Sequence, residues 1–212
     1  MLVKYPRTPH LPWSPGATKD DRVIGDVTCC LIGPVVITEK MDGENTTMYR
    51  KSIHARSIDS YSGHPSRSWI NHIHGNTAYM IDGEERVCGE NLYAQHSIHY
   101  DNLESYFLAF GIWKHDRCLS WPDTLGRLDY LGLKHVPVLY EGMIDESTLR
   151  RFHLDKGIEG NPKIEGFVVR PVRSFTMAEF GSVVAKWVRA GHVQTDEHWM
   201  SKPVIPNGLR GE

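Results

Sequence analysis

One lysine placed between two short strands constrains the fold of this chain most strongly. Residues 34–37 predict an apolar strand and residues 46–50 a second one. Asp42 and Gly43, which are typical β-turn residues, lie between them. Lys40 stands where the first strand ends, and a lysine held rigidly and partly desolvated in such a place is suited to act as a nucleophilic amine. A β-turn with a solvated lysine gives the same pattern, so the rest of the chain has to decide between the two.

Length, charge and cysteine usage narrow the class of protein. The 212 residues suit one packed domain, and no stretch is long and apolar enough for a membrane span, so we expect no membrane partner. A formal net charge of -2 argues against non-specific coating of nucleic acid but allows a local basic groove. The four cysteines form no C-x-x-C pair, and prolines interrupt the N-terminal segment where a signal peptide would be apolar. A cytoplasmic location is therefore expected.

The histidines do not predict a metal centre. His72 and His74 could share a strand face, and His96 and His99 a helix face. Neither pair has carboxylates or cysteines at a recognisable ligand spacing. We expect them to be surface or hydrogen-bonding residues.

The chain is organised as one domain, residues 1–212, whose residues 1–33 form an N-terminal arm rich in Pro, Gly and Asp. In this arm Leu11, Pro12 and Trp13 are expected to pack on the core. Strands surround a group of helices in the sequence, which predicts an α+β fold with antiparallel sheets. The expected strands are residues 86–93, 106–113, 135–140, 164–170 and 182–188; the expected helices are residues 66–74, 119–131 and 145–152; residues 54–65 are expected to form a loop.

Two of these helices carry end signals. Ser120 is a predicted N-cap for the helix that ends before Gly132. Asp145 is the predicted N-cap of the next helix, with Ser147 as a rival.

Five short polar segments follow one another in a fixed order. They are EKMDGEN around Lys40, ARS around Arg56, CGENLY around Glu90, EGFVVR around Glu165 and VAKWVR around Lys186. The aromatic run YFLAFGIW stands between the third and the fourth. The series resembles the covalent nucleotidyltransferases, and most closely the RNA ligase family of the T4 RNA ligase 2 type.

This resemblance covers most of the chain and implies a specific fold. The nucleotidyltransferase fold, which is ATP-grasp-like, has mostly antiparallel sheets flanked by helices around a central nucleotide cleft. Competing nucleotide and hydrolase signatures are missing from the sequence, because it contains no G-x-x-x-x-G-K-[ST], no G-x-G-x-x-G after a strand and no G-x-S-x-G.

The resemblance also implies which residues carry the chemistry. Lys40 matches the lysine that receives AMP, with Asp42 in the same signature. Glu165 matches an acidic residue near the metal and the lysine, and Asn45 a residue that assists metal or phosphate chemistry, in part through water. Lys186 matches the cation at the α-phosphate. Because a free lysine has a pKa of about 10.4, we expect burial, Lys186 and a divalent metal to lower the pKa of Lys40.

A second group of residues is implied to bind the nucleotide. Glu39 matches the residue that reads the adenine amino group, Arg56 an arginine near ribose and phosphate, and Glu90 the carboxylate at the ribose hydroxyls. Phe110 matches the aromatic side chain that stacks on the purine. Arg189 is included as a phosphate cation, because Val188 stands where the family often has a second lysine.

Several of these residues also fit plainer roles. Phe110 lies in a run apolar enough for core packing, and Lys186 alternates with apolar neighbours as a residue on a solvent face would. Arg170 stands where a lysine is common and supplies a forked cation. The side chains that could form either a basic rim or an ordinary solvated surface are Arg50, Lys51, Arg56 and Arg67.

The expected function is ATP-dependent RNA ligation. An enzyme of this kind uses ATP with Mg²⁺ or Mn²⁺ and joins RNA 5′-phosphate and 3′-hydroxyl ends through a lysyl-AMP on Lys40 and an adenylylated 5′ end. Residues 190–212 are too few for the oligonucleotide-binding domain that DNA ligases and capping enzymes carry after the last motif, so a bare catalytic domain is expected. The alternatives are a polynucleotide end-binding module, an adenylyltransferase that needs a partner to seal and, less favoured, a capping guanylyltransferase or a DNA ligase.

Overall fold

A computed structural model describes residues 2–58, 63–192 and 203–211. The segment 192–199, expected to pack on the core or to face the polynucleotide, lies outside these residues except for His192. None of the helices in the described ranges has the length and apolar character needed to cross a membrane.

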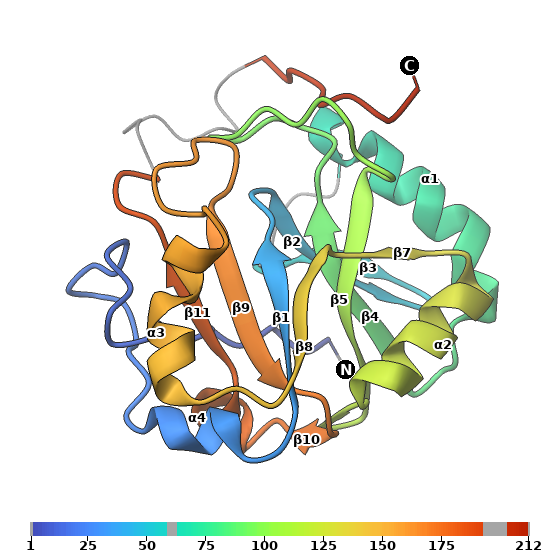
Figure 1. Ribbon diagram of the computed structural model, residues 1–212. Helices are drawn as coiled ribbons and strands as arrows, with labels where there is room; N and C mark the ends of the chain where they lie inside the picture. Colours follow the sequence, from blue (N-terminus) through green and yellow to red (C-terminus); the bar gives the residue numbers. More distant parts are fainter. Residues whose placement is uncertain (1, 59–62, 193–202, 212) are drawn as a thin grey trace.

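Two sheets form the centre of the molecule (Figure 1). Among the described residues, a four-stranded sheet has the order β11-β9-β1-β8 and a seven-stranded sheet the order β10-β6-β5-β4-β2-β3, with β7 beside β5. All of the strand pairs in these two sheets are antiparallel except β5 with β7, which is parallel. The predicted α+β fold with mostly antiparallel sheets is thus confirmed.

The strands of the first sheet are β1 (Val35–Lys40), β8 (Val138–Gly142), β9 (Gly166–Pro171) and β11 (Ala185–Val188). Those of the second are β2 (Glu44–Tyr49), β3 (Ile53–Ala55), β4 (Glu85–Asn91), β5 (Phe107–Lys114), β6 (Arg117–Cys118), β7 (Lys134–His135) and β10 (Phe175–Thr176).

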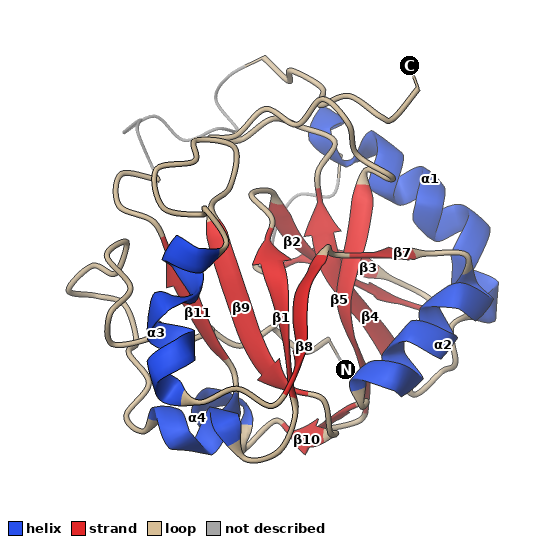
Figure 2. Cartoon of the chain, viewed as in Figure 1, coloured by secondary structure: helices blue, strands red, loops and turns tan. Residues whose placement is uncertain are grey.

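Helices cover the outer face of each sheet (Figure 2). The second sheet packs against α1 (Ser68–Thr77) and α2 (Trp121–Leu131). The first packs against α3 (Glu146–Asp155), with α4 (Phe180–Val183) and the 3₁₀ turn η1 (Val27–Leu31) nearby. Two further 3₁₀ turns, η2 (Pro65–Arg67) and η3 (Ala78–Met80), flank α1.

The predicted helix caps are confirmed. The Ser120 side chain accepts a hydrogen bond from the Asp123 amide, and Gly132 ends α2 in the left-handed region at φ 67°. Asp145 caps α3 by accepting from the Thr148 amide at 2.7 Å. Ser147, the rival cap, instead donates its hydroxyl hydrogen bond to Asp145.

Strand alternation gives the first sheet two different faces. Phe167 on β9 and Trp187 on β11 point outward into a core shared with Leu149 and Phe152 of α3. Residues one position away, such as Val168 and Lys186, point the other way, toward the second sheet. The inner face is therefore available for a site.

The N-terminal arm is ordered against the edge of the first sheet. The Lys186 amide donates to Pro9 at 2.9 Å, and the Leu11 amide donates to the Lys186 carbonyl at 2.7 Å. Leu11 is fully buried and Trp13 packs against the same core, as predicted, but Pro12, which was expected to pack there too, is exposed. The arm thereby covers the edge of β11, which would otherwise present unpaired backbone groups.

Three predicted elements need correction. The strand expected at residues 135–140 is broken at Pro137, which has no amide hydrogen for a sheet ladder, so β7 joins one sheet and β8 the other. The strand expected at residues 182–188 begins only at Ala185, because Ser182 belongs to α4. The loop expected at residues 54–65 starts with the last residues of β3.

Candidate active site between the two sheets

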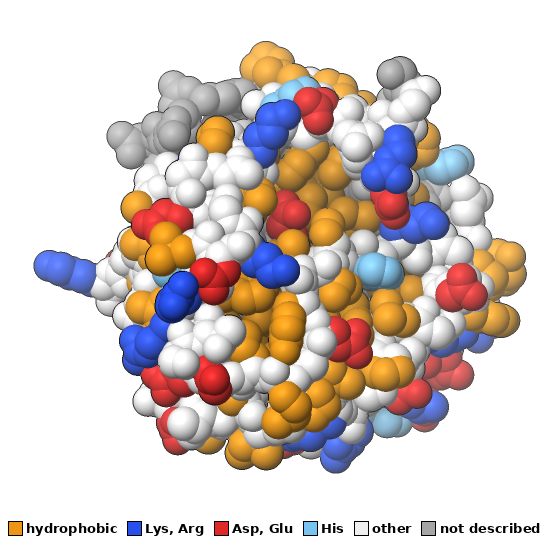
Figure 3. Space-filling model, in the orientation of Figure 1, with side chains coloured by type: hydrophobic (Ala, Val, Ile, Leu, Met, Phe, Trp, Pro, Cys, Tyr) orange, Lys and Arg blue, Asp and Glu red, His pale blue; other side chains and the backbone are white. Residues whose placement is uncertain are grey.

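A cavity of about 630 Å³ lies between the inner faces of the two sheets. Its volume is in the range of small-molecule pockets. Both sheets and the N-terminal arm contribute to its lining, including Lys40, Glu90, Phe110, Lys186 and Tyr5. A smaller cavity of about 400 Å³ lies near β7 and β8, where Figure 3 shows a hollow lined mainly by hydrophobic atoms. Glu39 borders both cavities.

Lys40 meets Glu165 because their strands are neighbours. In the β1–β9 pair Lys40 lies opposite Gly166, so the preceding Glu165 is brought to the lysine, and the Lys40 Nζ to Glu165 Oε2 distance is 2.6 Å. A Cβ atom on Gly166 would lie 1.9 Å from the Trp187 carbonyl oxygen, so only glycine fits where β9 passes β11. The lysine side chain is 26% exposed and the glutamate 6%. The two groups form an ion pair at the edge of the cavity.

This ion pair changes the expected protonation of the two lysines. Burial lowers the pKa of Lys40, but the charge of Glu165, the hydrogen bond to it and the charge of Asp42 outweigh burial, so the pKa lies above the ordinary value. The expectation that Lys186 would lower the pKa of Lys40 is therefore wrong for this state. Burial and the charge of Lys40 instead lower the pKa of Lys186. Lys186 reaches the cavity from β11, opposite Val168 of β9.

Asp42 is held in place by a neighbouring loop. Its Oδ2 accepts hydrogen bonds from the amides of Ser97 at 2.7 Å and Ile98 at 2.9 Å. Its own amide donates to the Tyr100 hydroxyl at 2.9 Å. Asp42 does not line the cavity, but its other oxygen, Oδ1, lies 3.4 Å from Nε2 of His192.

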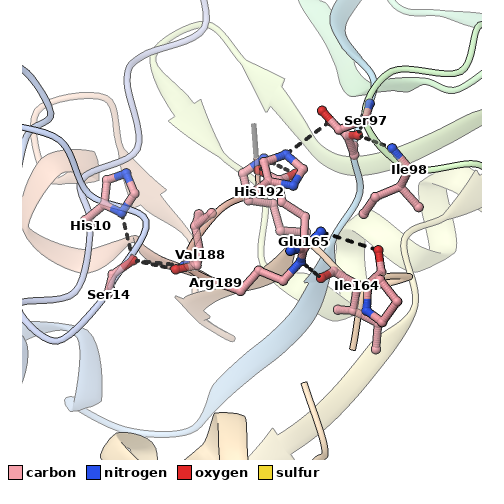
Figure 4. Close-up of polar contacts among 12 residues, drawn as sticks. His10, Ser14, Ser97, Ile98, Ile164, Glu165, Val188, Arg189 and His192 are labelled. Carbon is pink, nitrogen blue, oxygen red and sulfur yellow. Dashed lines mark hydrogen bonds and ion pairs between the residues drawn. The ribbon is translucent and has the colours of Figure 1, made fainter. Parts of the chain in front are cut away.

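His192 joins the two carboxylates. Its Nε2 lies 3.3 Å from Glu165 Oε1, in addition to the contact with Asp42. Figure 4 shows His192 next to Glu165, with Ser97 and Ile98 beyond it. Burial raises the pKa of Asp42, but the bonds from His192 and the Ile98 amide outweigh it and place the pKa below the ordinary value.

The second sheet supplies the opposite wall. Asn45 of β2 pairs with Glu90 of β4, and both line the cavity. Phe110 is the extra residue of a β-bulge, because Ala109 pairs with Gly89 and Gly111 with the preceding Cys88. Bulges re-aim side chains near binding sites. Phe110 lines the cavity here, packed edge-to-face against Tyr5 with ring centroids 5.1 Å apart.

Two carboxyls of the cavity stay protonated at neutral pH or near it. Burial raises the pKa of Glu39 to about 7. Burial, opposed in part by Lys40, raises the pKa of Glu90 to about 8. A protonated carboxyl can donate one hydrogen bond and accept others, so both residues can match the donors and acceptors of a base or sugar.

Some polar atoms of the cavity wall lack a protein partner. Nε of Arg56 and Oδ1 of Asn45 are buried with no hydrogen bond to described residues. Burial and the charge of Arg7 lower the pKa of Arg56. Buried polar atoms are normally satisfied. The Arg56 Nε–H is therefore suited to donate to an anionic ligand, and the Asn45 oxygen to accept from a water or another donor.

Three arginines take structural positions instead. Arg189 donates from Nε to the Ile164 carbonyl at 2.9 Å and does not line the cavity. It therefore lies apart from the other residues that were predicted to bind the nucleotide. Arg170 lines the cavity but donates to the Leu119 carbonyl at 2.8 Å and stacks over Phe175. Arg67, considered for a basic rim or a solvated surface, is 1% exposed and pairs with Glu44.

Sequence reasoning missed two contributors to the site. Tyr5 comes from an arm without periodicity, and nothing local to it points to a cavity. His192 follows the last motif. It lies 27 residues after Glu165 and 150 residues after Asp42 in the sequence, although it contacts both side chains in the fold. Neither distance forms a recognisable ligand spacing.

The donor atoms at this end of the cavity fit a divalent cation. The ligand atoms of Asp42, Glu165 and His192 all lie within 4.8 Å of one another, and all three residues are buried. Carboxylate oxygens and imidazole nitrogens are common ligands of divalent metals. Asn45 stands apart from this cluster, on the wall of the second sheet.

Comparison with known proteins identifies the family. The sequence model of the RNA ligase family matches residues 33–188, so the chain belongs to the RNA ligase family. No curated protein matches the sequence.

Solved structures share the fold. An archaeal ATP-dependent RNA ligase superposes with a TM-score of 0.58 at 15% identity, covering 88% of this chain and 48% of that one. A Naegleria gruberi RNA ligase variant determined with ATP and Mn gives 0.54 at 16%, covering 86% and 58%. A putative ATP-dependent DNA ligase from Aquifex aeolicus gives 0.57 at 15%, covering 90% and 51%. The present chain thus spans about half the length of these structures, and the nucleotidyltransferase fold is confirmed.

Proposed function

We propose that this chain is the adenylyltransferase domain of an ATP-dependent RNA ligase, with Lys40 as the residue that accepts AMP. The observation that carries the proposal is the position of Lys40 at the edge of a cavity, 2.6 Å from Glu165 and on the same inner sheet face as Lys186. Nucleophile, proton acceptor and phosphate cation are thus within one site.

In the first step, Nζ of Lys40 attacks the α-phosphorus of ATP. A nitrogen–phosphorus bond forms, the bond to the β-phosphate oxygen breaks, and pyrophosphate leaves. Glu165 Oε2 is the contact through which the lysine ammonium gives up its proton. Lys186 and Arg56 stabilise the negative charge that develops on the phosphates.

The second wall, together with Glu39 of β1, binds the rest of the nucleotide. Phe110 stacks on the purine, Glu39 contacts its amino group, and Glu90 binds the ribose hydroxyls. Asn45 Oδ1 meets a phosphate-bound or metal-bound water. Glu165, with Asp42 and His192 beside it, would hold a divalent cation, which would neutralise phosphate charge and compete with Lys40 for the Glu165 carboxylate. Mn²⁺ and Mg²⁺ are the ions to test, since a Naegleria gruberi ligase structure of this fold contains ATP and Mn.

The following steps involve RNA. The AMP moves from Lys40 to an RNA 5′-phosphate, and the 3′-hydroxyl of a second end then attacks that phosphate and displaces AMP. The second candidate is an adenylyltransferase that depends on a partner for sealing.

Intact-mass measurement tests the first step. After incubation with ATP and Mg²⁺ or Mn²⁺, the protein should gain the mass of one AMP, and Lys40→Ala should gain none. Incorporation from GTP but not from ATP would redirect the proposal to a capping-type enzyme, and no incorporation from either would contradict it. Nicked duplexes with RNA or DNA at the nick then separate sealing from accumulation of adenylylated 5′ ends.

A further inference from the structure

A histidine lies between the two carboxylates at the catalytic end of the cavity, and the proposed chemistry does not call for it. His192 Nε2 is 3.4 Å from Asp42 Oδ1 and 3.3 Å from Glu165 Oε1. The three side chains are 9%, 10% and 6% exposed. Three residues far apart in sequence therefore converge on one small volume beside Lys40.

We propose that His192 is a nitrogen ligand of a divalent-metal site completed by Asp42 and Glu165, and that this site selects a first-row transition ion over Mg²⁺. The assignment deepens the proposed function and rests on it for the use of a metal in nucleotidyl transfer. It does not rest on it for metal binding, which follows from the three side chains.

The carboxylates are prepared for this role by their other contacts. Asp42 Oδ2 is anchored by two backbone amides, and Glu165 Oε2 is anchored by Lys40. In each case the second oxygen is the one that faces the imidazole. Contacts of this kind orient metal ligands before the metal arrives.

The spacing of the donor atoms fits a compact site. Ligand bonds of about 2.0–2.1 Å in tetrahedral geometry place donor atoms about 3.3–3.4 Å apart. The two edges from His192 Nε2 measure 3.3 and 3.4 Å. A cation could therefore enter with only small movements of the three side chains.

The nitrogen sets the preference among metals. Mg²⁺ favours oxygen ligands in octahedral geometry and keeps several of its waters. Imidazole suits the later first-row ions, and affinity for mixed nitrogen and oxygen sites rises from Mn²⁺ to Cu²⁺ and falls again at Zn²⁺. A site with one imidazole and two carboxylates should bind Mn²⁺, Co²⁺ or Zn²⁺ more tightly than Mg²⁺.

Electron paramagnetic resonance of Mn²⁺ tests the assignment without ATP or turnover. Loss of the free Mn²⁺ signal gives the dissociation constant, competition gives the affinity for Mg²⁺, and pulsed measurements detect a nitrogen bound directly to manganese. His192→Gln should weaken Mn²⁺ binding roughly tenfold or more and abolish the nitrogen coupling. The matched control is His72→Gln, since His72 lies exposed on α1 and should change neither quantity.

A second variant keeps the test decisive. His192→Asp retains a ligand but replaces nitrogen by oxygen, so Mn²⁺ should still bind, without nitrogen coupling and with a smaller preference over Mg²⁺. Binding by His192→Gln that equals or exceeds the wild type, or wild-type Mn²⁺ without nitrogen coupling, would overturn the assignment and make the imidazole a placeholder that the metal displaces.

The two proposals fail in different ways. A protein that binds Mn²⁺ through nitrogen but gains no AMP from ATP contradicts the proposed function and supports the metal site. A protein that gains AMP on Lys40 but shows no nitrogen coupling supports the function and contradicts the metal site.

Discussion

The two walls of the cavity satisfy their polar groups in opposite ways. The first-sheet wall is formed by Lys40, Glu165 and Lys186, with Asp42 and His192 behind them. In this wall Glu165 contacts both Lys40 and His192, and His192 also contacts Asp42. On the second-sheet wall, formed by Asn45, Arg56, Glu90 and Phe110, two polar atoms have no hydrogen-bond partner among the described residues, and burial favours the neutral form of Glu90. Charged groups of the first wall therefore interact mainly with one another, whereas polar groups of the second wall are free to interact with a ligand.

This difference suggests a division of labour. Close contact between unlike charges lets a small change in geometry or ligand move a proton or expose a nucleophile. Unpaired polar groups beside an aromatic ring gain their partners when a nucleotide binds. Substitutions on the first wall should therefore change the rate of the covalent step, and substitutions on the second should change nucleotide affinity or the stability of the free protein.

Apart from Lys40→Ala, which should abolish AMP incorporation, the largest effect is expected for Lys186→Ala. Removal of one preorganised donor to developing charge costs roughly 10²–10³ in rate. The rate of AMP incorporation at saturating ATP should fall by that factor, with a smaller loss in Lys186→Arg, which keeps a cation. Rapid-quench assays with α-labelled ATP measure the rate, and Lys19→Ala, on the exposed part of the arm, is the control. An unchanged rate at saturating ATP would show that Lys186 does not stabilise the transition state of AMP transfer.

Phe110→Leu should act on binding instead. Stacking of a base on an aromatic side chain contributes about 1–3 kcal/mol, so the Kd for ATP should rise roughly tenfold. Calorimetry in a Lys40→Ala background measures this without covalent consumption of ATP, and the exposed Tyr79→Leu serves as the control. In Phe110→Leu with Lys40 intact, the rate of AMP incorporation at saturating ATP should stay within about twofold of the wild-type rate, a difference of about 0.4 kcal/mol in activation free energy. A large loss of rate with unchanged affinity would break the division between the walls.

The second wall also shows what sequence reasoning can reach. Motif order places Asn45, Glu90 and Phe110 in one cavity, and strand alternation accounts for Asn45 and Glu90. It does not account for Phe110, which lies in a nearly continuous apolar run. Only the bulge opposite Gly89 turns the ring toward the cavity, and a bulge depends on pairing with a strand 20 residues away.

The first wall shows where sequence reasoning stops. The resemblance of the motif series to RNA ligases implies that Lys40, Glu165 and Lys186 belong together, but not which lysine has the lowered pKa. That depends on which cation a carboxylate touches, and Glu165 touches Lys40. His192 and Tyr5 come from segments without strand or helix periodicity, so their positions follow only from the tertiary fold.

Glu90→Gln should sharpen the comparison through stability. The folded-state pKa of Glu90 is about 8 against an ordinary 4.5, so the folded protein holds a proton that the unfolded chain has lost between these values. Stability of the wild type should therefore fall as pH rises through this window, by at most about 1.4 kcal/mol per pH unit, and then level off. Glu90→Gln removes the contribution of Glu90 to this slope and leaves that of Glu39, whose pKa is raised to about 7.

The measurement is the difference in thermal stability between pH 5 and pH 9 without nucleotide. The variant should match the wild type at the acidic end and exceed it at the alkaline end. Glu141→Gln, at an exposed position of β8, should leave the wild-type slope in place. Parallel curves for Glu90→Gln and the wild type would show that the second wall carries no buried protonated carboxyl.

The smallest effect on chemistry is expected for Arg189→Ala. Its guanidinium donates to the carbonyls of Ile164 and Pro162, and its amide to the Glu165 carbonyl, so it secures the backbone that presents Glu165 rather than the cavity itself. Loss of the hydrogen bonds should lower the free energy of unfolding by about 1–2 kcal/mol. The rate of AMP incorporation should change by less than about threefold, or 0.7 kcal/mol. Denaturant unfolding and rapid-quench assays on the same preparation separate the two effects. A rate loss as large as that of Lys186→Ala would instead show that Arg189, which follows the end of β11, acts as a second cation at the phosphates.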